Sequence, residues 1–169
     1  MSVSFEDYVA FVESVSDYEP ARRHESGRCG LLCELGELLA IFDERRIKRK
    51  GFPSHAAILS ELGDVLWYEV WRSARTSSVA WDWRSESQVG LPILSRPAAD
   101  LAARGATSEV MRQVAVSPYQ SSQAVSSFLR GFGYTIEQIA EANMLKLTGR
   151  QAAGTLHDRE ARVGDGGAA

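Results

Sequence analysis

Four carboxylates recur at the same spacing in two stretches of the chain. The stretch LLCELGELL begins at Leu31 and the stretch ILSELGDVL begins at Ile58, and each holds two acids separated by a leucine and a glycine. Side chains three residues apart project from the same side of a helix. In both stretches the acids lie along one edge of an apolar stripe. The four acids are Glu34, Glu37, Glu61 and Asp64.

Two such helices, packed antiparallel as a hairpin, would bring the four carboxylates together beside the core. Crowded carboxylates are either neutralised by cations or have raised pKa values. Mg²⁺ takes oxygen ligands and commonly binds through carboxylates together with substrate phosphates. The pattern therefore indicates a Mg²⁺ site, with Mn²⁺ as the alternative ion. A solvated acidic helix face, or a duplication that retained no chemistry, would produce the same repeat.

Two glycines, Gly36 and Gly63, occupy equivalent positions in the two stretches. Glycine inside a helix costs about 1 kcal/mol relative to alanine. The repetition of that cost in one register predicts a close approach between helices at both positions.

A second group of polar residues stands near the C-terminus of the chain. Asn143, Lys146 and Arg150 follow each other at steps of three and four residues, so one continuous helix would place them on one face. Arginine offers a planar fork of donors and lysine a point charge, so this face could hold phosphate oxygens. The alternative is an ordinary basic helix C-terminus that the helix dipole favours.

A basic run, RRIKRK, extends from Arg45 to Lys50. It could attract anionic nucleotides, with Lys48 and Lys50 as the candidates for phosphate binding, or it could be a solvated basic helix end. Nucleic-acid binding through this run would predict an affinity that falls steeply with salt. The net charge of −3 argues against nucleic acid as the partner.

The elements that must position these residues are predicted to be helices, because apolar residues recur at three- and four-residue steps and no useful β-alternation occurs. Ser4 with Asp7, and Thr135 with Gln138, match the capping box of a helix start. The fold class is therefore predicted to be all-α. The expected helices cover about 5–15, 29–50, 54–74, 119–130 and 135–147.

A chain of 169 residues is expected to form one domain, assigned here to residues 1–158. The stretch of about 75–117 is rich in Ser, Gly, Pro and Arg and is interpreted as an insertion with one short helix near 98–104. Its Trp81 and Trp83 could stack on a nucleobase, but packing is the favoured interpretation. Residues 159–169 are expected to form a flexible tail.

No apolar run approaches the ~20 residues that cross a bilayer, and the N-terminus lacks the basic and apolar regions of a secretory signal. The two cysteines, Cys29 and Cys33, cannot form a disulfide framework, so a reducing cytoplasm is the expected location. Together with His24 and His55 they match no usual zinc spacing. Both thiols are expected to be at least partly buried.

The segments GLLCELGELLAIF and ILSELGDVLWY resemble the MazG-like group of all-α nucleoside triphosphate pyrophosphohydrolases. The signature of that group is Glu-x-x-Glu on one helix and Glu-x-x-Asp on the next. The segment GYTIEQIAEANMLKLTGR resembles the C-terminal helix of the same family, which carries Asn-x-x-Lys and a following Arg. The resemblance covers roughly residues 5–74 and 119–157.

This resemblance implies a helical bundle that assembles as a homodimer or homotetramer and splits a ribo- or deoxyribonucleoside triphosphate into the monophosphate and pyrophosphate. Lys146 and Arg150 would contact the triphosphate, and Asn143 the sugar or base. The implied catalytic residues, which are also the implied Mg²⁺ ligands, are Glu34, Glu37, Glu61 and Asp64.

The sequence departs from the family in two places. Some relatives carry a further acid where this chain has Cys33, so the resemblance identifies no general base. The insertion at about 75–117 is absent from compact relatives. Two alternatives to the proposed activity remain: hydrolysis of a modified nucleotide such as phosphoribosyl-ATP, and a non-catalytic helical module that binds a metal or a partner protein.

Overall fold

The computed structural model describes residues 3–16, 20–73, 107–115 and 121–156. Every regular element within these residues is a helix. The predicted all-α class is therefore confirmed for this part of the chain. Most of the expected insertion, including its short helix near 98–104 and both of its tryptophans, lies outside the described residues, as does the tail at 159–169.

The first helix, α1 (Phe5–Val15), has the predicted bounds and begins at a capping box. The Asp7 N–H donates to Ser4 Oγ at 3.1 Å, and the Ser4 N–H donates to the Asp7 carboxylate at 3.3 Å. These bonds satisfy amides that the first turn of a helix leaves without an intrahelical acceptor. The apolar stripe of α1 buries Tyr8, Val12 and Val15.

The prediction of a second helix at about 29–50 is wrong in two respects: the helix begins earlier, and it does not continue to residue 50. A short 3₁₀ turn, η1 (Pro20–Arg22), leads into α2 (Arg23–Ile41), which therefore begins earlier than predicted. The basic run forms a separate helix, α3 (Glu44–Lys50).

Asp43 causes the break between α2 and α3. Its Oδ1 accepts hydrogen bonds from the Arg45 N–H at 2.9 Å and from the Arg46 N–H at 3.2 Å. An aspartate that caps a new helix start in this way offers the backbone an alternative to continuing the previous helix. The basic side chains consequently belong to α3 and not to the end of α2.

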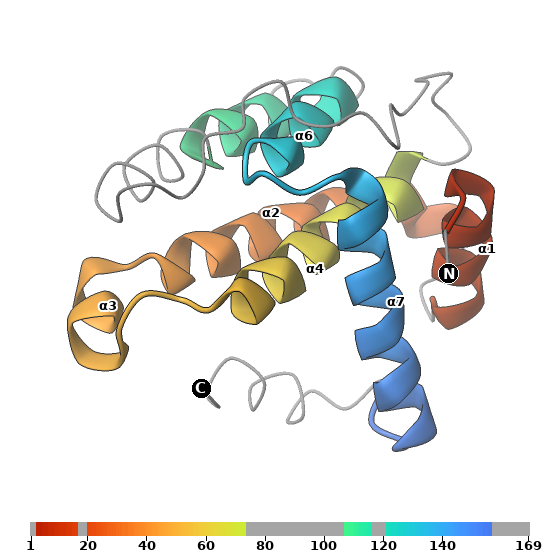
Figure 1. The fold of residues 1–169 in the computed structure, drawn as a ribbon. Coiled ribbons are helices and arrows are strands. Elements are labelled where there is room, and N and C mark those ends of the chain that lie inside the picture. Colours follow the sequence, from red (N-terminus) through yellow and green to blue (C-terminus); the bar gives the residue numbers. More distant parts are fainter. Residues whose placement is uncertain (1–2, 17–19, 74–106, 116–120, 157–169) are drawn as a thin grey trace.

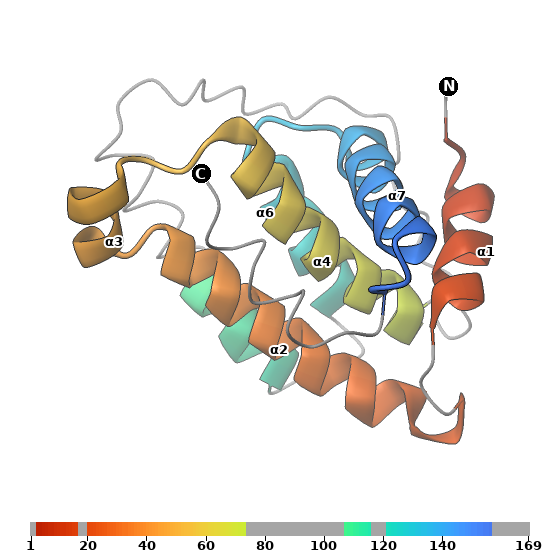
Figure 2. The same cartoon turned by 90° about the horizontal axis from the view of Figure 1, so that it is seen from below.

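The central element is α4 (His55–Ser73), which begins at the predicted Pro53-Ser54 restart. The Ala57 N–H donates to Ser54 Oγ at 3.2 Å. α4 runs antiparallel to α2 and also contacts α1, α6 and α7, as Figures 1 and 2 show. Every residue from Trp67 to Ser73 is buried because neighbours cover α4 on several sides.

Two further helices complete the labelled elements: α6 (Ser121–Arg130) and α7 (Ile136–Ala152). A capping box opens α7, in which the Gln138 N–H donates to Thr135 Oγ1 at 3.1 Å. Because α7 continues past its predicted end at residue 147, Lys146 and Arg150 lie on one helix. Residues 107–115 are also helical, which the sequence analysis did not predict.

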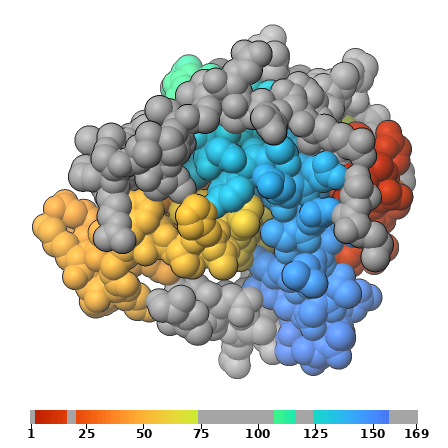
Figure 3. All heavy atoms as spheres, viewed as in Figure 1, coloured from red at the N-terminus to blue at the C-terminus, as the bar shows by residue number. Residues whose placement is uncertain are grey.

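The helices surround one apolar core, with α4 at its centre. In Figures 1 and 2, α6 and the helical residues 107–115 lie on one side of the α2–α4 pair, and α1 and α7 lie together against another side of α4. Part of α4 (yellow) remains visible between α3 and α7 on the face in Figure 3. None of the described helices is both long and apolar enough to cross a bilayer.

Candidate metal and phosphate site

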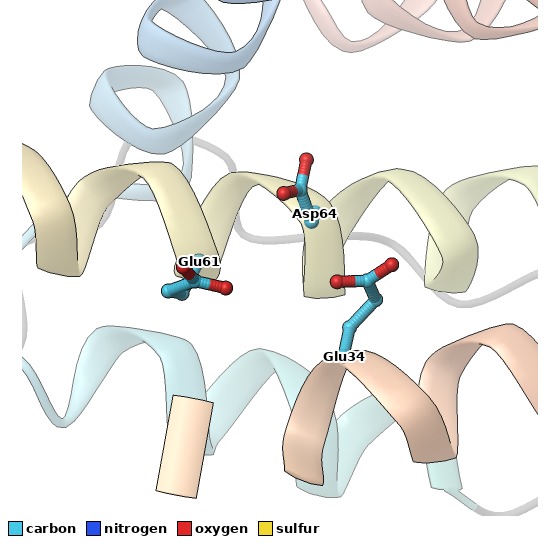
Figure 4. A group of neighbouring side chains, drawn as sticks. All are labelled: Glu34, Glu61 and Asp64. Atoms are coloured by element: carbon cyan, nitrogen blue, oxygen red, sulfur yellow. The ribbon is translucent and has the colours of Figure 1, made fainter. Parts of the chain in front are cut away.

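Three carboxylates from two helices converge at one edge of the α2–α4 pair. Glu34 of α2, and Glu61 and Asp64 of α4, each offer one oxygen, and the three oxygens all lie within 4.8 Å of one another. Figure 4 shows Glu34 extending from α2 toward the helix that carries the other two. The predicted hairpin thus brings together three of the four predicted acids. We call Glu34, Glu61 and Asp64 the acidic cluster.

Apolar residues beside the acids fix the position of the acidic cluster. In α2, Leu31 and Leu35 are fully buried on either side of Glu34, and in α4 Leu62 and Val65 are fully buried next to the two acids. Burying these residues sets the rotation of each helix about its axis. The acids are then held at the margin of the core, where all three are half-buried.

Glu37 lies outside the acidic cluster. Its side chain is on the exposed part of α2, and it contributes no oxygen to the group within 4.8 Å. Its negative charge nevertheless adds to the rise in the pKa of Glu34 and of Glu61. Its role as a fourth metal ligand stays a prediction.

Two members of the acidic cluster have strongly raised pKa values. Burial is the largest cause and the charge of Asp64 the next; together with the other acids they raise the pKa of Glu34 to about 8 and that of Glu61 to about 7, although Lys146 lowers both. A site that retains protons at neutral pH has a strong excess of negative potential. A cation that enters such a site replaces those protons.

Lys146 of α7 supplies a positive charge to the cluster. Its Nζ lies 2.5 Å from Asp64 Oδ2 and donates to Ser60 Oγ at 2.9 Å. The Lys146 and Asp64 side chains are 16% and 22% exposed, so this ion pair is largely shielded from solvent. Ser60, one turn before Asp64 on α4, was not singled out by the sequence analysis.

Asn143 holds the other oxygen of Asp64. Its Nδ2 donates to Asp64 Oδ1 at 3.2 Å, and its Oδ1 accepts a hydrogen bond from the Tyr8 hydroxyl at 2.9 Å. Both Asn143 and Tyr8 are fully buried. Burial, and after it the charge of Asp64, raises the pKa of Tyr8, so its hydroxyl keeps its proton. The predicted contact between Asn143 and a sugar or base stays untested, whereas the observed contacts are within the protein.

The backbone at Gly63 leaves room for Asn143. A Cβ at position 63 would lie 2.9 Å from Asn143 Cβ and 3.0 Å from its Nδ2. A Cβ at Gly36 would meet no atom within 4 Å among the described residues. The predicted close helix approach is therefore present at Gly63, where α7 packs on α4, and absent at Gly36.

The remaining predicted phosphate contacts have different positions. Arg150 lies half-buried one helical turn beyond Lys146. Lys48 and Lys50 are exposed on α3, and Lys48 Nζ pairs with the Glu44 carboxylate at 2.7 Å. In the same helix Arg46, which the sequence analysis did not select, is half-buried, and its positive charge counteracts the effects of burial and Asp64 on the pKa of Glu61.

The cysteines differ from their expected environment. Cys29 and Cys33 are both free and exposed, so the expectation of at least partly buried thiols is wrong. Within the described ranges, the acidic cluster is the only group of three or more His, Cys, Asp or Glu side chains placed to share an ion, so the cysteines and histidines form no zinc site there.

Tyr8, like Ser60, is a site residue that the sequence did not point to. It belongs to the apolar stripe of α1 and is 135 residues from Asn143 in the sequence. No local pattern distinguishes a core tyrosine from one whose hydroxyl reaches a polar site.

Comparisons with models of known protein families, with curated proteins and with solved structures found no match to this chain.

Proposed function

We propose that this protein is a Mg²⁺-dependent nucleotide pyrophosphohydrolase of the MazG-like kind, which hydrolyses a ribo- or deoxyribonucleoside triphosphate to the monophosphate and pyrophosphate. The observation that carries the proposal is the acidic cluster, in which oxygens of Glu34, Glu61 and Asp64 lie within 4.8 Å of one another. The repeated sequence pattern and the cationic Lys146 beside the cluster support it.

The donor set of the cluster fits a hard divalent cation. All three side chains offer carboxylate oxygens, which are the ligands that Mg²⁺ and Mn²⁺ prefer. Burial and the neighbouring acids raise the pKa values of Glu34 and Glu61, and the positive charge of Lys146 offsets this rise only in part. Glu34, Glu61 and Asp64 would hold the ion, with Glu37 as a further ligand. When bound, the ion would neutralise phosphate oxygens and favour attack at phosphorus.

The cationic side chains of α7 would bind the anionic substrate. Lys146 already lies at the cluster, and Arg150 follows one turn later on the same helix. Guanidinium and ammonium groups donate charge-assisted hydrogen bonds to phosphate oxygens. The reaction forms one bond from a water oxygen to the α-phosphorus and breaks the bond to the bridging oxygen, so pyrophosphate leaves. We assign the general base to no residue.

The proposal extends to assembly and location. A homodimer or homotetramer in the reducing cytoplasm is proposed from the family resemblance and from the two cysteines, which are free and exposed. Size-exclusion chromatography with light scattering distinguishes these assemblies from a monomer.

A nucleotide panel tests the activity. Ribo- and deoxyribonucleoside triphosphates and phosphoribosyl-ATP are incubated with the protein in Mg²⁺ or in chelator, and the products are separated by anion exchange. We expect monophosphate and pyrophosphate in equal amounts, from at least one nucleotide, in Mg²⁺ only. Release of orthophosphate would contradict the proposed bond cleavage. Metal binding without hydrolysis of any substrate would favour the non-catalytic module instead.

A further inference from the structure

A chain of two hydrogen bonds connects α1 to the acidic cluster. The Tyr8 hydroxyl donates to Asn143 Oδ1 at 2.9 Å, and Asn143 Nδ2 donates to Asp64 Oδ1 at 3.2 Å. The first bond lies wholly within the core, since both Tyr8 and Asn143 are fully buried. The polar groups of a buried amide must be paired inside the protein, because an unpaired one loses its hydrogen bonds to water without replacement.

The direction of these bonds determines how Asn143 faces Asp64. The Asn143 amide could be turned by 180°, which would exchange its oxygen and nitrogen. In the turned state a carbonyl oxygen would face the Asp64 carboxylate. An ionised carboxylate can only accept hydrogen bonds, so these two oxygens could form none with each other. The Tyr8 hydroxyl donates to the amide oxygen and so stabilises the arrangement in which the NH₂ group points at Asp64.

We propose that Tyr8 is a positioning residue of the candidate metal site: through Asn143 it holds the Asp64 carboxylate in the orientation that receives the metal ion. The inference rests on the proposed function, because it assumes that the acidic cluster binds a divalent cation. It gives α1, which contributes no ligand to the cluster, an indirect influence on metal affinity. Tyr8 is expected to act on the metal only through Asn143.

The test compares two tyrosine hydroxyls. Tyr8→Phe removes the hydroxyl and keeps the buried ring, while Tyr134→Phe is the matched control, because its hydroxyl is hydrogen-bonded to His55 Nδ1 at 2.6 Å, away from the cluster. Mn²⁺ affinity is measured from the electron paramagnetic resonance signal of free Mn²⁺. We expect Tyr8→Phe to weaken binding about fivefold, the factor that corresponds to one hydrogen bond of ~1 kcal/mol. Tyr134→Phe should bind Mn²⁺ as the wild type does.

A double-mutant cycle separates positioning from a merely structural effect. In the Asn143→Ala background, Tyr8→Phe should produce no further loss of Mn²⁺ affinity, because the intermediate group is already absent. A purely structural effect of Tyr8 would lower affinity by the same factor in both backgrounds and would overturn the inference. Where turnover is measurable, Tyr8→Phe should raise the Mg²⁺ concentration for half-maximal activity without changing KM for the nucleotide at saturating Mg²⁺.

The outcomes distinguish this inference from the proposed function. Equal Mn²⁺ affinity in Tyr8→Phe and the wild type overturns the role of Tyr8 and leaves the metal site intact. Absence of Mn²⁺ binding by the folded wild-type protein overturns both. If Asn143→Ala fails to fold, equal Mn²⁺ affinity in Tyr8→Phe and the wild type still overturns the inference, and a raised nucleotide KM for Tyr8→Phe at saturating Mg²⁺ overturns positioning of the metal site.

Discussion

At the scale of single residues, bound protons and a lysine both reduce the negative charge of the acidic cluster. Protons remain on Glu34 and Glu61, whose pKa values are about 8 and 7, and the Lys146 ammonium lies 2.5 Å from Asp64 Oδ2. A divalent cation would have to replace the protons and share Asp64 with the lysine. The protons and the lysine each have a measurable consequence.

The retained protons predict an unusual dependence of stability on pH. The pKa of Glu34 and Glu61 is higher in the folded chain than the ordinary value of 4.5, so the folded chain binds more protons between about pH 5 and pH 8. The free energy of unfolding therefore falls as pH rises through this window. In chelator, the thermal midpoint of the wild type should be lower at about pH 9 than at about pH 6.

Glu34→Gln provides the comparison, because glutamine imitates the protonated acid at every pH. Its thermal midpoint should fall less than that of the wild type between the same pH values. Glu25→Gln, an exposed change on the same helix, should keep the wild-type dependence. An equal fall of the thermal midpoint with pH in Glu34→Gln and in the wild type would contradict the raised pKa of Glu34.

The lysine predicts competition with the metal. Replacing Lys146 by Met removes a positive charge from the neighbourhood of the ion, so Mn²⁺ should bind about tenfold more tightly, which corresponds to ~1.4 kcal/mol. The measurement is made at about pH 9, where the proton on Glu34 no longer competes. Nucleotide turnover by the same variant should fall, because Lys146 is proposed to bind phosphate. Weaker Mn²⁺ binding would show that Lys146 assists the ion and does not oppose it.

At the scale of elements, α4 positions the site because every other part of it packs against this helix. α2 brings Glu34 to α4, and α7 brings Asn143 and Lys146 to it. The close contact between α7 and α4 depends on the absence of a side chain at Gly63. The equivalent Gly36 has no such neighbour among the residues that the structure describes, which makes the two glycines a natural pair for comparison.

Alanine at these two positions should have opposite effects on stability. Gly36→Ala gains helix propensity and its Cβ would meet no atom of the described helices within 4 Å, so it should raise the free energy of unfolding by up to ~1 kcal/mol. Gly63→Ala would press on Asn143 and should lower that free energy by about 1–3 kcal/mol while weakening Mn²⁺ binding. Urea unfolding measures the free energy of unfolding of both variants. A stabilised Gly63→Ala variant would show that the close contact at Gly63 imposes no constraint.

Helix starts with explicit capping groups were predictable from the sequence, and so was the acidic pair of helices. Ser4 and Thr135 gave the starts of α1 and α7, because their side chains bond to nearby amides. Asp43 caps α3 by the same chemistry but lies inside a continuous polar and basic run, so the break there was missed. Tyr8 could not be predicted, because its role depends on packing between α1 and α7.

At the scale of the whole molecule, the last two turns of α4 carry a buried ion pair. Arg72 Nη2 donates to both carboxylate oxygens of Glu69, at 2.8 and 2.6 Å, and both side chains are almost completely buried. Removing one partner of a buried pair leaves the other charge poorly compensated. The pair is therefore a point at which a single change should affect the whole fold.

Glu69→Gln should lower the free energy of unfolding by about 3 kcal/mol or more. Glu109→Gln is the control, because Glu109 and Arg112 form an exposed pair at 2.6 Å whose loss should leave the unfolding midpoint unchanged. Urea unfolding followed by circular dichroism measures both. The double variant Glu69→Leu/Arg72→Met should recover much of the lost stability. If Glu69→Gln and Glu109→Gln lowered the free energy of unfolding by equally small amounts, burial of the Glu69–Arg72 pair would not make it more important than an exposed pair.

Pyrophosphate release by the wild type, Asp64→Asn and Glu25→Gln is compared at saturating Mg²⁺, with folding checked by circular dichroism. We expect equimolar monophosphate and pyrophosphate from the wild type and from Glu25→Gln. We expect a loss of about 100-fold or more in Asp64→Asn, because this change removes a charge from the proposed metal site. Unchanged release by folded Asp64→Asn would contradict the assignment of catalysis to the acidic cluster.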